Sequence, residues 1–150
     1  MTEPKRPAAV TEAQHRHLKA FPACAITGKT VGVQAHHIVD FDACERIGLP
    51  ELASDPRNFV TLVESEAGKP EPNLHLLAGH CGSFRSINFN ILHELTLPIW
   101  KKSDAEIKAD PWFKDRVNNR MKPVSEWDDD EAAAAKATAL KMFPKLQGGA

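Results

Sequence analysis

The chain has 150 residues, a length that fits one domain with a short appendage. Hydrophobic residues make up 42% of it and charged residues 26%, which is ordinary for a soluble globular protein. The formal net charge of -1 excludes a strongly basic protein that coats nucleic acid through counterion release alone. No apolar run approaches the roughly 20 residues that cross a bilayer, and no secretory signal opens the chain. We therefore expect a cytoplasmic protein with no membrane partner.

Three cysteines, at positions 24, 44 and 81, are an odd number and form no Cys-x-x-Cys pair. This argues against a disulfide framework and against a four-cysteine zinc site. The histidines are more informative, because four of the seven fall in a short central part of the chain.

The N-terminal part predicts a helix followed by a hairpin. Residues 11–20 favour a short helix with Thr11 as its N-cap, ended by a Phe-Pro pair. Residues 23–27 favour a short strand, and a Gly-Lys pair then supplies a turn. Apolar and polar residues alternate over 31–36, which is the period-2 pattern of a second strand. We therefore expect residues 24–38 to form a β-hairpin.

The middle of the chain predicts short elements joined by loops. A short helix is expected around residues 44–47, and the apolar run 59–63 fits either a strand or the start of a helix. Residues 65–73 contain one glycine and two prolines and indicate an exposed loop. A second apolar stretch follows over residues 87–100.

The C-terminal part has a different character. Residues 104–120 are charged and broken by Pro111, and residues 128–146 predict an alanine-rich helix. Four acidic residues open that helix, where the helix dipole favours negative charge. These pieces predict the α+β class, with a two-stranded hairpin packed on helices, because a hairpin alone is marginal in water. We divide the chain into an N-terminal helical arm (1–22), a core (23–100) and a C-terminal helical extension (101–150).

The first candidate for chemistry is the adjacent pair His36 and His37 at the end of the predicted strand. Neighbouring strand residues point to opposite faces, so one histidine can bind a metal while the other faces a substrate. Histidine suits both tasks, as a metal ligand and as a base near neutral pH. Two unrelated surface or packing histidines remain the alternative.

The second candidate is the pair His75 and His80, which are five residues apart. A spacing of four would place both on one helical face. If the intervening Ala78 and Gly79 bend the chain, both histidines can still converge on one ion. The alternative is one ligand with one structural histidine. Asn58, after an Asp-Pro pair, is by itself a turn asparagine.

Taken in order, the segments CAITGKTVGVQAHHIVD, SDPRNFVTL and NLHLLAGH resemble the HNH endonuclease family. That pattern has a hairpin leading to His-His-Ile, then an asparagine before an apolar run, then a third histidine. The resemblance covers residues 24–90. The stretch LLAGHCGSFRSINFN is also similar to HNH-like proteins of bacteriophages and prophages.

The resemblance implies a ββα-metal (His-Me finger) core, in which a two-stranded hairpin and a helix hold one divalent ion, Mg, Mn, Ni or Zn. His36 and His75 would be metal ligands and His80 the third. His37 would be the general base that takes a proton from water. Asn58 would hold the loop and orient His37 by hydrogen bonding.

The chain departs from the family pattern in its long loop between Asn58 and His75, in its lack of zinc knuckles, and in its histidine spacing of five. The loop and the spacing leave the identity of the last ligand open. Without knuckles, the fold must be held by its core rather than by zinc.

The implied function is hydrolysis of DNA phosphodiester bonds, by nicking or double-strand cutting, with little sequence preference and alongside other phage or defence proteins. Lys29, Arg57 and Arg85 lie nearest the site in sequence and are expected to contact DNA, with basic residues after position 100, such as Arg116, extending the contact. For each, an ordinary solvated charge is the alternative. The competing function is a non-catalytic HNH-fold module that docks on nucleic acid or protein.

Overall fold

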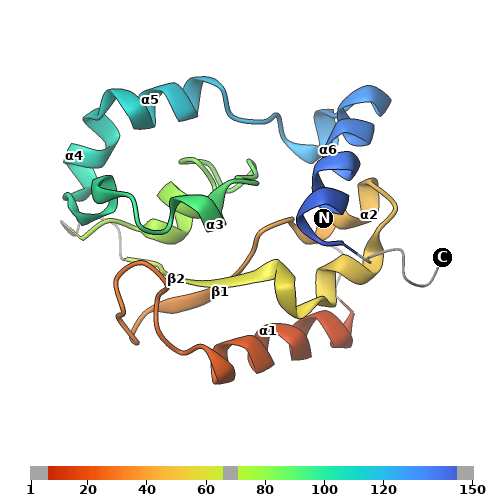
Figure 1. The fold of residues 1–150 in the computed structure, drawn as a ribbon, viewed down its shortest axis with the longest axis horizontal. Helices are drawn as coiled ribbons and strands as arrows, with labels where there is room; N and C mark the ends of the chain where they lie inside the picture. Colours follow the sequence, from red (N-terminus) through yellow and green to blue (C-terminus); the bar gives the residue numbers. More distant parts are fainter. Residues whose placement is uncertain (1–6, 66–70, 145–150) are drawn as a thin grey trace, which may run out of the picture.

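The computed structural model describes residues 7–65 and 71–144. They form a two-stranded antiparallel sheet surrounded by short helices, which confirms the α+β class (Figure 1). Helix α1 (Ala8–Ala20) packs on the sheet from one side, and the π-helix η3 (His75–Gly79) contacts both strands. The sheet thus lies between the N-terminal helix and the segment that carries two of the candidate ligands.

The two strands are β1 (Val33–His37) and β2 (Phe59–Val63). They pair with Val33 opposite Val63 and His37 opposite Phe59. The strand predicted from the period-2 pattern is therefore confirmed as β1. The apolar run 59–63, which fitted a strand or a helix, is a strand buried along its whole length.

The predicted hairpin over residues 24–38 is wrong in its first strand, because residues 24–28 form a turn. The Cys24 carbonyl accepts a hydrogen bond from the Gly28 N–H at 2.8 Å, and the Cys24 N–H donates to the Lys29 carbonyl at 2.7 Å. These bonds use backbone groups that a strand would offer to a neighbour. Gly28 adopts φ +77°, which a glycine tolerates without a Cβ clash. The place beside β1 is taken by β2.

Three short helices connect β1 to β2. They are α2 (Phe41–Arg46) and the 3₁₀ helices η1 (Pro50–Ser54) and η2 (Pro56–Asn58). The predicted helix around residues 44–47 corresponds to α2, although it begins and ends earlier. Each 3₁₀ helix begins with proline, whose fixed φ suits the first helical position. This connection folds back so that Asn58 lies beside the end of β1.

Helix α1 begins three residues before the predicted N-cap. Its N-cap is Pro7, and no side chain caps it, so the assignment of Thr11 as the cap is wrong. The extended backbone of Pro7 already directs the chain into the first turn (φ -55°, ψ 147°). The predicted end at Ala20, before the Phe-Pro pair, is confirmed.

After η3 the chain forms the helices α3 (Ile91–Glu94), η4 (Pro98–Lys101) and α4 (Asp104–Ala109). Helix α5 (Pro111–Asn118) starts at Pro111, so the predicted break in the charged segment is confirmed. The loop predicted over residues 65–73 falls partly on residues 66–70, which lie outside the described residues.

The C-terminal helices are η5 (Val124–Glu126) and α6 (Asp129–Met142). Asp128 caps α6 and forms a reciprocal capping box with Glu131, as the acidic start of the predicted helix suggests. The helix ends at Met142, before the predicted position 146, because Pro144 disfavours helical backbone at the residue before it. Residues 145 and 146 lie outside the described part.

One buried cluster joins the sheet to the helices on both sides of it. Its fully buried members include Ile38 after β1, Leu62 in β2 and Leu77 in η3. The same cluster continues into the C-terminal helices through Ile107, Phe113, Ala139 and Phe143. Within residues 7–65 and 71–144, no helix is long and apolar enough to span a membrane.

Candidate metal centre

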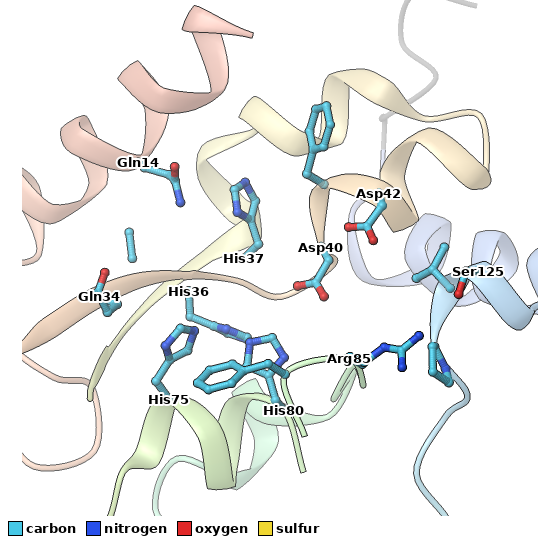
Figure 2. A pocket seen from close by; sticks show the side chains of 15 residues that line it. Gln14, Gln34, His36, His37, Asp40, Asp42, His75, His80, Arg85 and Ser125 are labelled. Atoms are coloured by element: carbon cyan, nitrogen blue, oxygen red, sulfur yellow. The ribbon is translucent and has the colours of Figure 1, made fainter. Parts of the chain in front are cut away.

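Strand β1 presents its two adjacent histidines to opposite sides, as its period of two requires (Figure 2). The His36 ring lies against the rings of His75 and His80. The His37 ring lies on the other side, 4.5 Å from the Phe59 ring between centroids. Both side chains are buried, so their different surroundings rather than their exposure distinguish them.

Three imidazoles gather on the His36 side of the strand (Figure 2). The ring centroids are 5.1 Å apart for His36 and His75, 4.7 Å for His36 and His80, and 5.0 Å for His75 and His80. One ring nitrogen of each lies within 4.8 Å of those of the other two. The structure thus brings together all three predicted ligands in a group able to hold a metal ion.

The π-helix η3 explains how two histidines five residues apart meet. In a π-helix the hydrogen bonds join residues five apart, so the turn is wider than an α-helical turn and position i+5 returns to the side of position i. His75 opens this turn and His80 follows its last residue, Gly79. The bend anticipated at Ala78 and Gly79 therefore takes the form of one wide turn.

Gly79 lets η3 approach the His36 ring. A Cβ at this position would lie 3.0 Å from His36 Cε1 and 3.1 Å from both ring nitrogens. Such contacts are closer than ordinary packing allows, so any larger residue would displace the imidazole. Gly79 is therefore needed for the close approach of η3 to the His36 ring, whereas the sequence indicated this glycine only as a point where the chain could bend.

Hydrogen bonds fix which nitrogen of His75 and His80 faces the group. His75 Nδ1 lies 2.9 Å from Glu64 Oε1, and His80 Nδ1 lies 2.8 Å from the Ser86 carbonyl oxygen. A carbonyl can only accept, so His80 Nδ1 carries the proton and donates, and an ionised Glu64 imposes the same role on His75. Each ring therefore keeps its lone pair on Nε2, the arrangement that outer partners impose on metal-binding histidines.

His36 differs because both its nitrogens are buried and neither has a hydrogen-bond partner among the described residues. An unsatisfied buried polar group costs roughly 1–3 kcal/mol, so this arrangement needs an explanation. A metal ion shared with His75 and His80 would supply a partner for one of these two nitrogens. The residues present therefore fit a bound metal.

Burial also favours the neutral form of His36 and His80, as metal binding requires. It lowers the pKa of His36 well below its ordinary value, and the neighbouring His80, His75 and His37 lower it further. Burial lowers the pKa of His80 to about 4, although the hydrogen bond to Ser86 acts in the opposite direction. At neutral pH the lone pairs of His36 and His80 are therefore available to a cation.

The chemistry of the ligand set limits the choice of metal. Three imidazoles suit zinc, nickel or manganese and suit magnesium less well. Three protein ligands also leave a coordination position for water or substrate, as in catalytic zinc sites. The group opens into a pocket of about 760 Å³ that His37 also lines. Its other polar walls come from Gln14, Gln34, Asp40, Asp42, Arg85 and Ser125 (Figure 2).

On the other side of β1, a backbone carbonyl orients His37. Its Nε2 lies 2.8 Å from the Ala53 carbonyl oxygen in η1. Because the carbonyl accepts, Nε2 carries the proton and the lone pair of the neutral ring is on Nδ1. This tautomer makes Nδ1 the basic atom of His37.

Asn58 holds the backbone around this carbonyl. Its side-chain oxygen accepts from the Val39 N–H at 2.8 Å, and its amide donates to the carbonyls of Val39 at 3.0 Å and Leu52 at 3.2 Å. Leu52 precedes Ala53 in the chain. These bonds tie the segment after β1 to η1, so Asn58 positions the residue that orients His37.

Of the predicted nucleic-acid contacts, the structure places only Arg85 in the histidine pocket. The Arg57 guanidinium is 2.8 Å from Asp55 Oδ2 and donates to the Pro144 carbonyl at 2.7 Å. Lys29 lines a separate cavity of about 380 Å³, with Lys101 and Lys102. Arg57 thus joins η2 to the end of α6, and Lys29 lies apart from the histidines.

A polar network behind η3 was not foreseen from the sequence. The Asn88 amide donates to the Ala78 carbonyl at 2.7 Å and to Glu94 Oε1 at 2.8 Å. Arg116 donates to Asn88 Oδ1 at 2.7 Å and pairs with Glu94 Oε2 at 2.6 Å. Asn88 and Glu94 were visible only as polar residues within an apolar stretch. Arg116, a candidate DNA contact, supports the π-helix.

Comparison of the chain with models of protein families, with curated proteins and with solved structures finds no match. The chemistry of the pocket is therefore inferred from its own atoms.

Proposed function

We propose that this protein is a metal-dependent endonuclease of the HNH type that hydrolyses phosphodiester bonds in DNA. The observation that carries the proposal is the pairing of two arrangements in one pocket. Three imidazoles offer a metal site, and a fourth, His37, has its basic nitrogen set by the Ala53 carbonyl. A Lewis acid beside a base is what hydrolysis of an unreactive phosphodiester needs.

His36, His75 and His80 would hold one divalent ion. When bound, the ion acts as a Lewis acid toward the phosphate and its leaving oxygen. His37 Nδ1 takes a proton from a water molecule as its oxygen attacks phosphorus. The new P–O bond forms while the bond to the leaving sugar oxygen breaks, and that oxygen takes a proton from solvent.

Two neighbours assist His37 and the substrate. The Ala53 carbonyl accepts from Nε2 and so stabilises the imidazolium that forms at His37. Arg85 donates to an unesterified phosphate oxygen, a charge-assisted contact. Among the described residues that line the pocket, Arg85 is the only arginine or lysine. So few basic contacts fit an enzyme with little sequence preference of its own, and the resemblance to phage and prophage proteins suggests such an origin.

A non-catalytic metal-binding module is the second candidate. Asp40 and Asp42 line the same pocket, and their negative charge disfavours a phosphodiester there. A domain that uses the metal to dock on nucleic acid or protein would tolerate these carboxylates. The two functions differ in whether a bond is cut.

The test is cleavage of supercoiled plasmid by protein stripped of metal with a chelator, with Mg, Mn, Ni or Zn restored separately. His37→Ala removes the base, and His93→Ala is the matched control at an exposed histidine in α3. We expect cleavage that requires a metal, is lost in His37→Ala and is retained in His93→Ala. Nicked and linear products separate single-strand from double-strand cutting. Intact plasmid with every metal, or equal cleavage by His37→Ala, would contradict the proposal.

A further inference from the structure

Phe84 stands out among the residues of the histidine pocket. It is 49% exposed and is the only exposed large hydrophobic side chain among the described residues that line this pocket. Isolated apolar residues on a surface are ordinary, so exposure alone decides nothing. Phe84 also lies beside two candidate metal ligands, so its exposed ring faces the place where a substrate would bind.

The Phe84 ring is held in place by the imidazoles themselves. It packs edge-on against His75 at 5.3 Å and against His80 at 5.1 Å between ring centroids. His75 and His80 are in turn fixed by Glu64 and the Ser86 carbonyl. An aromatic ring anchored in this way loses little conformational freedom when a planar ligand stacks on it.

The next residue supplies the complementary chemistry. Arg85 lines the same pocket and extends toward Ser125 on the opposite wall (Figure 2). Phe84 and Arg85 therefore offer, side by side, an apolar ring and a cation. A nucleotide carries the matching pair of groups, a flat base and a charged phosphate.

We propose, on the basis of the nuclease function above, that Phe84 stacks on an unpaired nucleobase next to the phosphodiester that is cut. In a regular duplex both faces of a base are covered by its neighbours, so only an unpaired or displaced base can meet the ring. The enzyme then prefers single-stranded or locally unpaired DNA to regular duplex. Supercoiled plasmid is a substrate because it opens locally.

The competing role is shielding, in which Phe84 only keeps water from the imidazoles. Two substitutions separate the roles. Phe84→Leu keeps apolar bulk but removes the aromatic face, whereas Phe84→Trp keeps and enlarges that face. Phe21→Leu is the matched control, because Phe21 is also exposed but does not line the pocket.

The experiment measures fluorescence anisotropy of labelled DNA with zinc-loaded protein on a His37→Ala background, which prevents cutting. The DNA is one strand alone, the same strand in full duplex, and a duplex with a central unpaired segment. Stacking of one base on an aromatic ring corresponds to roughly a 5- to 150-fold change in affinity. We expect Phe84→Leu to weaken binding of the single strand and of the unpaired segment within that range, and Phe84→Trp to retain it.

Zinc affinity, measured by competition with a chromophoric chelator, is the readout for shielding. We expect Phe84→Leu and Phe21→Leu to leave zinc affinity unchanged. Unchanged single-strand binding in Phe84→Leu, an equal loss on full duplex, or a loss of zinc affinity in place of DNA affinity would each overturn the inference.

The two proposals fail separately. If Phe84→Leu loses single-strand binding but no metal supports cleavage by the parent protein, the nuclease function fails and the stacking role stands. If cleavage requires metal and His37 while Phe84→Leu binds every DNA like its parent, only the stacking role fails.

Discussion

The two adjacent histidines of β1 have different hydrogen-bonding environments, although they are the same residue type. His36 and His37 are both buried, yet among the described residues only His37 donates a hydrogen bond to the backbone, from Nε2 to the Ala53 carbonyl at 2.8 Å. Both His36 nitrogens lack a partner within the described residues. The fold therefore gives a backbone partner to His37, the proposed base, and none to His36, a candidate ligand for which a metal would satisfy one nitrogen. Coordination would relieve the cost, about 1–3 kcal/mol, of an unsatisfied buried group.

Substituting His36 and His37 separately should give the largest effects, and each substitution should affect a different property. His37→Ala should lower plasmid cleavage roughly 10²- to 10⁴-fold, as expected for loss of a general base, with zinc affinity unchanged. His36→Ala should lower zinc affinity by more than the roughly 10- to 100-fold that loss of an outer partner costs. Chelator competition and plasmid cleavage measure the two effects. If both variants changed zinc affinity equally, the division of tasks along β1 would be wrong.

Acid should destabilise the metal-free protein because the buried imidazoles of His36 and His80 resist protonation. The folded-state pKa of His80 is lowered from 6.5 to about 4, and burial lowers that of His36 too. Below about pH 6.5 the unfolded chain binds a proton at His80 that the folded chain refuses, so the contribution of His80 to stability is lost as the pH falls to about 4. The His80 shift corresponds to about 3 kcal/mol.

Urea unfolding between pH 7 and 4 measures this loss. His80→Ala should make the pH profile less steep, because only the contribution of His36 then remains, and His15→Ala at an exposed position in α1 is the control. Bound zinc should steepen the loss, because protons then compete with the metal. A flat profile in the parent protein would contradict the burial of neutral imidazoles.

Glu64→Gln tests the partner of His75. Glutamine keeps an acceptor near Nδ1 but removes the negative charge that makes the imidazole a better ligand. We expect zinc affinity to fall by up to roughly 10- to 100-fold, with cleavage largely retained at saturating metal. Glu45→Gln, at an exposed position in α2, is the control and should bind zinc like the parent. Equal zinc affinities of Glu64→Gln and Glu45→Gln would show that Glu64 does not contribute to metal binding.

Gly79→Ala should have the smallest effect. Alanine gains roughly 0.5–1 kcal/mol over glycine inside a helix, but its Cβ would meet the His36 ring at 3.0 Å. We expect a net destabilisation of about 1 kcal/mol, within the range for overpacking, and weaker zinc binding. Urea unfolding with and without zinc measures both. A more stable variant with parental zinc affinity would show that the His36 ring moves freely.

Part of the fold was predictable from local pattern. Alternation over residues 31–36 predicted β1 and hence the opposite directions of His36 and His37. The partner strand was not, because β2 is buried on both faces and its apolar run has no period to separate strand from helix. Residues 24–28 fold into a turn through local hydrogen bonds between Cys24, Gly28 and Lys29, which no alternation pattern indicates.

The site shows the same limit. The family resemblance implied His36, His75 and His80 as candidate ligands, but a spacing of five would separate His75 and His80 on a regular α-helix. Their convergence depends on the π-helix. Glu64 and Asn88 reach η3 only through strand pairing and helix packing, so no local pattern indicates them. Arg57 appeared available for DNA in the sequence, but its partners lie beside it at Asp55 and far along the chain at Pro144.

The network behind η3 has a consequence for anyone who wishes to transplant this site. Arg116 in α5 pairs with Glu94, and both contact Asn88, which holds the Ala78 carbonyl of the wide turn. A fragment that ends at residue 100 would contain every histidine of the pocket. It would lose the Arg116 guanidinium, which holds Asn88 and Glu94 behind η3. The smallest fragment that keeps the histidine group supported therefore extends through α5, because it must include the Arg116–Glu94 ion pair as well as the candidate ligands.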